Sequence, residues 1–191
     1  MKKEKLSKLV DHLEEILKIL TDSKIKDSWI RKTYAEYLIA FKLASQGHEV
    51  QICNERDVRN ADIYLPDIRK RVEVKSGLYE EDEYGIYVGA SFGKGTQITK
   101  EKFDYCAFVT FDQNQVREIF LFKKEEMKEV GIPRPKIAGF PKTNPCLLLF
   151  YKKLESYQKF IKDLPECKLR VEYDLNKHPS RYENRWSIIG N

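Results

Sequence analysis

The sequence predicts an α/β fold, or an α+β sheet domain as its near alternative. The order of the segments supports this prediction, because two helical stretches are followed by three short strands rich in Val and Ile, then by a helix and a further strand. The length of 191 residues favours one domain and is sufficient for a hydrophobic core without disulfide bonds. We therefore expect a single domain over residues 1–191.

The first two elements are expected to be helices. Apolar residues recur at helical spacing between Leu6 and Leu20, with lysines and glutamates between them. A polar break at residues 21–28 offers Asp27 or Ser28 as the N-cap of a second helix. That helix is expected to run to about Gln46, with Gly47 ending it.

Strands are expected next, at residues 48–54, 61–65 and 71–76, separated by polar turns. Residues 77–95 contain five of the nine glycines and are expected to form a long functional loop or an irregular hairpin. The remaining expected elements are a short helix at 99–102, strands at 105–111 and 116–122, a helix at 123–130, a surface connection at 131–145, a strand at 146–151, a helix at 154–164 and a polar tail at 165–191 that ends in the patch Trp186, Ile188 and Ile189.

Composition narrows the class of protein. The 35 basic and 30 acidic residues give a net charge of +5, which permits a nucleic-acid partner without requiring one. No apolar run reaches 18 residues and the N-terminus is highly charged, so we expect neither a membrane span nor a secretory signal. The four cysteines lack CxxC spacing and no histidine has zinc-site spacing, which fits a reduced, cytoplasmic protein.

The chemistry is concentrated in residues 60–77, which predict two strands joined by a tight turn. If Leu65 faces Val72 in an antiparallel hairpin, then Asp62 faces Lys75, and Asp62, Glu73 and Lys75 project from one face. The other face then carries Ile63, Val72 and Val74. Two acids supply the oxygen ligands that magnesium prefers, and a lysine can sit beside an attacking water and a phosphate.

This pattern resembles the PD-(D/E)xK nuclease superfamily, which has the restriction-endonuclease-like fold. The matching residues are Asp62, a spacing of ten residues, and then Glu73-Val74-Lys75. Glu36 stands in the preceding helix where the family often has a further acid, and Gln97 resembles the polar residue that many relatives carry before their second core helix. The resemblance covers about residues 30–125. It implies a mixed central β-sheet flanked by helices, with N- and C-terminal extensions.

The resemblance also implies an activity, that of a magnesium-dependent DNA endonuclease. A type II restriction enzyme that cuts a short specific duplex site is the form we expect. Asp62 and Glu73 would hold Mg²⁺, or Mn²⁺ in its place, with the carbonyl of Val74 as an extra ligand and Glu36 as the further acid. Lys75 would orient or deprotonate the attacking water. The alternatives are a junction or repair nuclease of the same fold, and a non-catalytic DNA-binding protein on that fold.

The expected partners follow from this activity. They are double-stranded DNA, a second copy of the chain in a homodimer, and a cognate DNA methyltransferase of the same restriction system. The catalytic core would occupy residues 27–125. The helical extension at 1–26 and the elaboration at 126–191 would then serve dimerisation and base reading.

Several of the residues assigned to the site have a second possible interpretation. Pro66-Asp67 is also a literal PD pair before Glu73, but the hairpin places Asp67 in the turn. Glu36 could instead be an ordinary ion-pair partner of Lys32 one turn earlier. An alternating Val-Glu-Val-Lys strand can also simply present a solvated face, and Gln97 can be a surface residue.

DNA contacts are expected from two further segments. The glycine-rich loop after residue 90 has hydroxyl and lysine side chains that can lie on a phosphate backbone, with a flexible hairpin tip as the alternative. The tail has Arg and Asn side chains suited to base edges, whereas Trp186 is expected to anchor packing. The candidate DNA-binding residues are Ser91, Lys94, Thr96, Lys100, Arg181, Asn184 and Arg185. A basic patch of Arg134, Lys136, Lys142, Lys152 and Lys153 can also face DNA or be a solvated connection.

Overall fold

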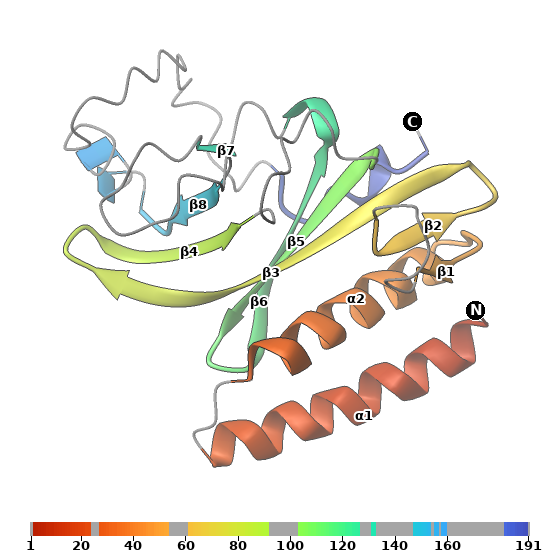
Figure 1. Cartoon of the computed structure of the whole chain (residues 1–191), viewed down its shortest axis with the longest axis horizontal. Helices are drawn as coiled ribbons and strands as arrows, with labels where there is room; N and C mark the ends of the chain where they lie inside the picture. The colour runs from red at the N-terminus through yellow and green to blue at the C-terminus, as the bar shows by residue number, and fades with distance from the viewer. Residues whose placement is uncertain are drawn as a thin grey trace.

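The computed structural model describes residues 2–23, 27–53, 61–91, 103–126, 131–132, 147–153, 155–156, 158–159 and 182–190. Two helices, α1 (Lys3–Asp22) and α2 (Ser28–Ser45), precede all the strands. Figure 1 shows both helices on the same side of the sheet, with α2 next to the strands and α1 outside it. No helix among the described residues is long and apolar enough to cross a membrane.

The strands form one mixed sheet. Along its main path the order is β1-β2-β3-β4-β8-β7, and β5 pairs with both β3 and β6. The β3–β5 pair is parallel and the other pairs are antiparallel, so the predicted α/β class with a mixed central sheet is confirmed. The strands are β1 (Gln51–Ile52), β2 (Ile63–Leu65), β3 (Lys70–Asp82), β4 (Gly85–Ser91), β5 (Tyr105–Asp112), β6 (Gln115–Lys123), β7 (Gly131–Ile132) and β8 (Leu147–Tyr151).

The helix ends form where the sequence predicts. The Asp27 side chain accepts hydrogen bonds from the backbone N–H groups of Trp29 (2.8 Å) and Ile30 (3.0 Å), which satisfies two of the free donors at the start of α2. Gly47 has φ +97°, the left-handed conformation that lets the chain leave the helix. The expected N-cap and the expected end of the second helix are therefore confirmed.

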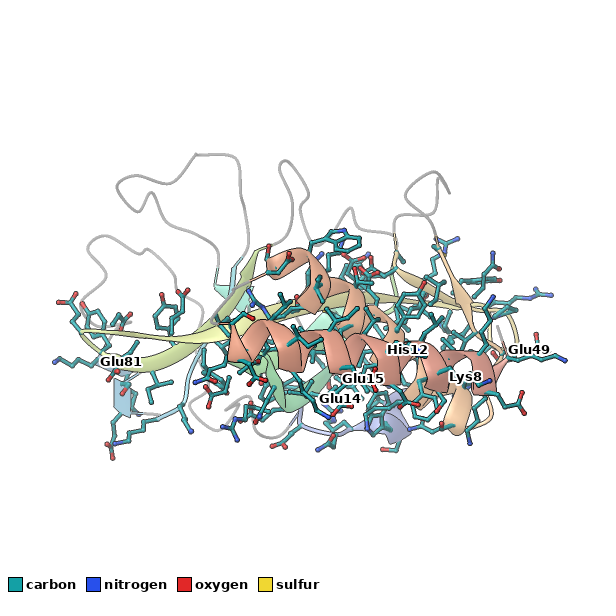
Figure 2. The ribbon with its side chains drawn as sticks, turned by 90° about the horizontal axis from the view of Figure 1, so that it is seen from below. Lys8, His12, Glu14, Glu15, Glu49 and Glu81 are labelled. Carbon is teal, nitrogen blue, oxygen red and sulfur yellow. The ribbon has the colours of Figure 1, made fainter. Side chains whose placement is uncertain are left out.

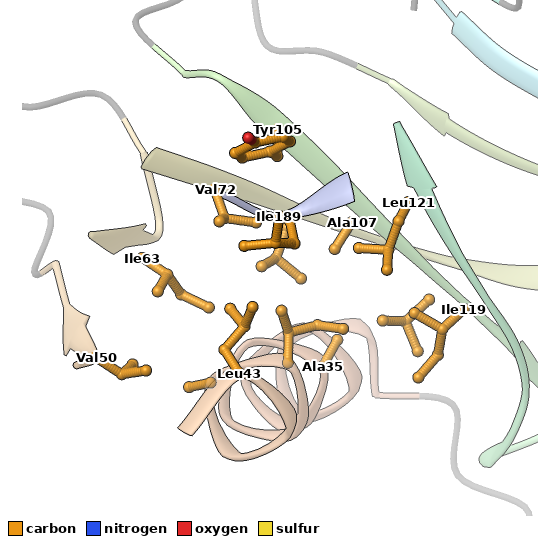
Figure 3. Close-up of a cluster of buried hydrophobic side chains, with 14 of the residues drawn as sticks. Ala35, Leu43, Val50, Ile63, Val72, Tyr105, Ala107, Ile119, Leu121 and Ile189 are labelled. Carbon is orange, nitrogen blue, oxygen red and sulfur yellow. The ribbon is translucent and has the colours of Figure 1, made fainter. Parts of the chain in front are cut away.

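The main core lies between the helices and the sheet (Figure 3). Ala35 and Leu43 of α2 face the buried strand residues Ile63, Val72 and Leu121. Two distant parts of the chain join this core: α1 contributes Leu6, Val10 and Leu17, and the end of the chain contributes Ile188 and Ile189. The apolar patch expected near the C-terminus is thus a core element, held by the short 3₁₀ helix η3 (Trp186–Ile188).

Strand β3 is much longer than the expected strand at 71–76. It pairs with β5 from Val72 to Leu78 and with β4 from Tyr79 to Asp82. Of the two alternatives expected for this segment, a loop or an irregular hairpin, the described part therefore forms a hairpin, and a more regular one than expected. A Cβ atom on Gly77 would lie 2.7 Å from the carbonyl oxygen of Gly89 and 2.9 Å from Phe108. Glycine is therefore needed at this position because another backbone approaches closely there.

Some of the other expected helices and strands are present, and others lie wholly or partly outside the described residues. The strands expected at 105–111, 116–122 and 146–151 are present as β5, β6 and β8. The expected surface connection at 131–145 opens with strand β7, which pairs with β8. The helix expected at 99–102 and residues 92–95 lie outside the described residues. The helix expected at 123–130 is helical at residues 124–126, its remaining part being outside the description.

Candidate active site

The candidate site lies on the edge of β3 just beyond the end of β2. On β3, strand β2 pairs with Lys70–Val72 and ends there. At the next position along this edge, the Oδ2 atom of Asp62 accepts a hydrogen bond from the backbone N–H of Val74 at 2.7 Å. Beyond the end of β2, the side chain of Asp62 therefore takes over the hydrogen bonding to β3. Its carboxylate is held at the edge of the sheet.

The hairpin register differs from the expected one by two residues. The Cα partners are Ile63 with Val72 and Leu65 with Lys70, whereas the prediction paired Leu65 with Val72. Continuing the observed register places Asp62 opposite Glu73, not opposite Lys75. The cause is a shorter turn of four residues, 66–69, in which Arg69 adopts a left-handed conformation with φ +56°.

A shift of two residues leaves the alternation of side chains unchanged, because the period of a strand is two. Ile63, Val72 and Val74 are therefore buried in the core as predicted. Glu73 and Lys75 alternate with them and project from the opposite face of β3. The two side chains are mostly buried, with exposed fractions of 11% and 20% respectively.

Glu73 and Lys75 form an ion pair in which Lys75 Nζ donates to Glu73 Oε1. Burial opposes the charged form of Lys75, but the negative charges of Glu73 and Asp62 outweigh it and raise the lysine pKa. Lys75 is therefore an ammonium group set among carboxylates. In the parallel register, Glu73 lies beside Cys106 of β5.

Glu36 of α2 is electrostatically coupled to Asp62 and Lys75. Its carboxylate lies 3.5 Å from Lys32 Nζ and its side chain is only 18% exposed. Burial and then the charge of Asp62 raise the pKa of Glu36 to about 7, while the cations Lys32 and Lys75 act in the opposite direction. The ion pair of Glu36 with Lys32 is therefore present, while the role of Glu36 as a further acid of the site stays a prediction.

Asp67 lies in the β2–β3 turn, as the sequence predicts, and not beside Glu73 and Lys75. Its Oδ2 atom is 2.7 Å from Nδ1 of His48, three residues beyond the end of α2. This contact ties the turn of the hairpin to the C-terminal end of the helix. The literal Pro66-Asp67 pair thus has a structural partner, and Asp62 is the aspartate that reaches the edge of β3.

The remaining residues that were expected to bind DNA or to act in catalysis lie elsewhere in the fold or outside the described residues. Asn184 lies at an exposed turn with φ +51°, and its backbone N–H donates to the carbonyl of Ile119. Arg185 donates to Glu126 at 3.0 Å and lies 5.0 Å from the centre of the Tyr182 ring, so it is engaged within the fold. Ser91 is the last residue of β4. Outside the described residues are Lys94, Thr96, Gln97, Lys100, Arg134, Lys136, Lys142 and Arg181.

Sequence reasoning missed Cys106 as a neighbour of the site. Cys106 is fully buried and has a reduced thiol, and its ionised form would add to the charges that raise the pKa of Lys75. Its position depends on the parallel pairing of β3 with β5, two strands separated by more than twenty residues. No local pattern in the sequence predicts that register.

The donor atoms of the site fit magnesium by type. Asp62 and Glu73 offer carboxylate oxygens, and Mg²⁺ is usually bound by one or two carboxylates together with waters and substrate phosphates. Over the described ranges, no group of three or more His, Cys, Asp and Glu side chains is arranged to hold a metal ion. Asp62 and Glu73 are thus two carboxylate donors that suit Mg²⁺ by chemical type alone.

Comparison with known proteins adds one structural likeness. The chain matches no known family model and no curated protein. Among solved structures, it is similar to the bacterial homing endonuclease I-Ssp6803I, with a TM-score of 0.49 and 12% sequence identity over 87% of this chain and 93% of that chain. At this identity, the function of the chain has to be inferred from its own residues.

Proposed function

We propose that this protein is a magnesium-dependent endonuclease that hydrolyses phosphodiester bonds in double-stranded DNA, and that it acts as a type II restriction enzyme. One observation carries the proposal: Asp62 is held on the Val74 N–H, opposite Glu73 and next to Lys75, at an edge of β3 that no strand covers among the described residues. Two carboxylates and an ammonium group in one place match the requirements of metal-assisted phosphodiester hydrolysis.

Asp62 and Glu73 would hold Mg²⁺, or Mn²⁺ in its place. The N–H and C=O groups of one strand residue point to the same edge of the strand. Because the N–H of Val74 points to Asp62, its carbonyl lies on the Asp62 side as well and is suited to be a further ligand. Magnesium, when bound, would neutralise charge on the scissile phosphate and activate a water molecule.

Lys75 would orient or deprotonate the attacking water. Its ion pair with Glu73 keeps the ammonium group beside a metal-binding carboxylate, where water and phosphate would also meet. Glu36 would support the site from α2, since its carboxylate lies near both Asp62 and Lys75. The homodimer and the cognate methyltransferase belong to this proposal, because a restriction enzyme cuts both strands of a palindromic site and must spare its host's DNA.

The test is to incubate the protein with plasmid and phage DNA in the presence of Mg²⁺ and with EDTA. We expect discrete fragments that require the metal. Asp62→Asn should abolish them, whereas the matched variant Asp67→Asn should keep cleavage within a few-fold of the unmodified protein, because Asp67 pairs with His48 in the turn. The reverse result would make Pro66-Asp67 the functional pair.

Other outcomes discriminate the alternatives. Preferential cleavage of branched substrates would indicate a junction or repair nuclease instead of a restriction enzyme. If the protein binds DNA but does not cleave it with Mg²⁺ or Mn²⁺, the enzymatic function is contradicted. The alternative of a non-catalytic DNA-binding protein would then apply. Cleavage that persists in EDTA would contradict the metal dependence.

A further inference from the structure

Helix α1 carries a second apolar stripe beside the one that packs in the core. Leu6, Val10 and Leu17 are buried in the core that α1 shares with α2. Leu9, Ile16 and Ile19 form a neighbouring stripe on the same helix, with the exposed and polar His12 between Leu9 and Ile16. Ile16 is 40% exposed and Ile19 is 64% exposed, so the fold leaves a large part of this second stripe in contact with solvent.

The charges on α1 are divided between its two halves. Residues 2–9 contain four lysines and one glutamate, a net charge of +3, whereas residues 10–22 contain Asp11, Glu14, Glu15 and Asp22 against Lys18, a net charge of −3. All of these charged side chains are exposed. In the view of Figure 2, α1 lies in front of the other elements, with Lys8, His12, Glu14 and Glu15 along it.

We propose that this stripe binds the same stripe of a second copy of the chain, with the two α1 helices antiparallel. An antiparallel arrangement brings the basic half of each helix against the acidic half of the other, whereas a parallel arrangement would place like charges together. A two-fold axis makes such a contact self-complementary, so that each favourable pair occurs twice. The proposal names a surface for the homodimer of the proposed function and rests on it to that extent, but its test measures association and needs no cleavage.

The pattern also defines the alignment of the two helices. With the axis near residue 14, Ile19 of each copy faces Leu9 of the other and Ile16 faces His12. The same alignment brings Lys8 near Asp22 of the other copy. A helix of 20 residues is about 30 Å long, so the contact is smaller than a standard interface of about 1,600 Å². The dimer is accordingly weak and concentration-dependent.

The test is sedimentation equilibrium of the full-length protein over a range of protein and salt concentrations. We expect a reversible monomer–dimer equilibrium that shifts toward monomer as salt rises, because screening weakens exposed charge pairs. Ile19→Ser should weaken dimerisation by about tenfold, since two exposed isoleucines leave the interface. The control is Ile86→Ser, because Ile86 is also an exposed isoleucine (42%) but lies on β4, away from α1. It should leave the monomer–dimer equilibrium unchanged.

A charge exchange tests the antiparallel alignment. Lys8→Glu should also weaken the dimer by about tenfold, because it turns two attractive pairs into repulsive ones. Adding Asp22→Lys to the same chain should restore the affinity. Thermal melting of each variant monitors the fold separately. A protein that stays monomeric at all concentrations, a dimer that Ile19→Ser leaves intact, or an exchange that does not restore affinity would each overturn the proposal.

Discussion

The two halves of β3 carry similar numbers of charged side chains but place them in different surroundings. In the first half, Lys70–Ser76, the strand pairs with β2 and β5, and Glu73 stands between Val72 and Val74, which are 0% and 1% exposed. In the second half, 77–82, the strand leaves the core to pair with β4, and Glu80, Glu81 and Asp82 are exposed.

The difference shows why an alternating charged strand is sometimes a site and sometimes a surface. An exposed carboxylate such as Glu81 is stabilised by water and needs no partner, and the exposed Glu80 accepts a hydrogen bond from the Tyr87 hydroxyl at 2.9 Å. A largely buried carboxylate such as Glu73 loses that hydration and requires a cation or donors nearby. The first half of β3 provides Lys75 for this purpose. Only the second half presents its charged side chains as a solvated face.

The largest effect should separate these two halves. We expect Asp62→Ala or Glu73→Ala to reduce DNA cleavage by at least about 10²–10³, because each removes a proposed metal ligand. The matched variants Glu80→Ala and Glu81→Ala, on the second half of the same strand, should cleave normally. Cleavage rates with Mg²⁺, beside thermal melting to check the fold, measure this. Robust cleavage by Asp62→Ala or Glu73→Ala would end the assignment of the site.

Lys75 is expected to come next. Lys75→Ala removes the charge, and Lys75→Arg keeps the charge on a bulky planar group that cannot give up its proton. Both should reduce cleavage by about 10²–10³, while DNA binding survives because phosphate and base contacts elsewhere supply most of the affinity. Single-turnover cleavage with a gel-shift titration separates the two quantities. Near-normal cleavage by Lys75→Arg would remove the lysine from the mechanism.

The sequence predicted the parts of this site that depend on local periodicity. The alternation of side chains along a strand predicts the face of β3 on which Glu73 and Lys75 lie. The residue preferences of turns predict that Asp67 lies in the β2–β3 turn. The register of the hairpin was wrong by two residues because turn length depends on the left-handed conformation of Arg69, which no residue preference indicates.

Contacts between distant segments were beyond such reasoning. The approach of Cys106 to Glu73 depends on parallel pairing across a long connection, and the burial of Ile188 and Ile189 depends on where the end of the chain returns to the sheet. The need for glycine at position 77 likewise arises only when β4 crosses close to β3. These features come from tertiary packing rather than from local sequence.

The junction of the two halves is the next test of the comparison. Gly77→Ala would place a Cβ atom 2.7 Å from the Gly89 carbonyl oxygen and 2.8 Å from Val88, and the backbone oxygen cannot move without shifting β4. We expect the free energy of unfolding to fall by about 1–3 kcal/mol, measured by urea denaturation. Ser76→Ala, one residue earlier, is the control and should be nearly neutral. An unchanged stability of Gly77→Ala would show that β4 is not packed tightly on β3.

The smallest expected effect concerns Glu36, whose pKa is raised to about 7 by burial and by Asp62. The folded protein binds a proton here at a pH where the unfolded chain does not, so this group lowers stability progressively as the pH rises from about 4.5 to about 7. Glu36→Gln removes that dependence. In EDTA, the variant should therefore exceed the unmodified protein in stability at pH 8, by about 1–2 kcal/mol, and the difference should shrink toward pH 5.

Thermal melting across this pH range measures the effect. Glu14→Gln is the control, because it breaks a Glu–Lys pair of the same spacing at an exposed position, where Glu14 lies 3.6 Å from Lys18. It therefore reports the loss of such an ion pair by itself. Added Mg²⁺ should stabilise the unmodified protein more at pH 8 than at pH 5, because protons compete with the metal for the carboxylates. The contrary outcome is a stability difference between Glu36→Gln and the unmodified protein that stays constant with pH. It would mean that Glu36 is not held in the field of Asp62. The first half of β3 would then lack the crowding of negative charge that distinguishes it from the second half.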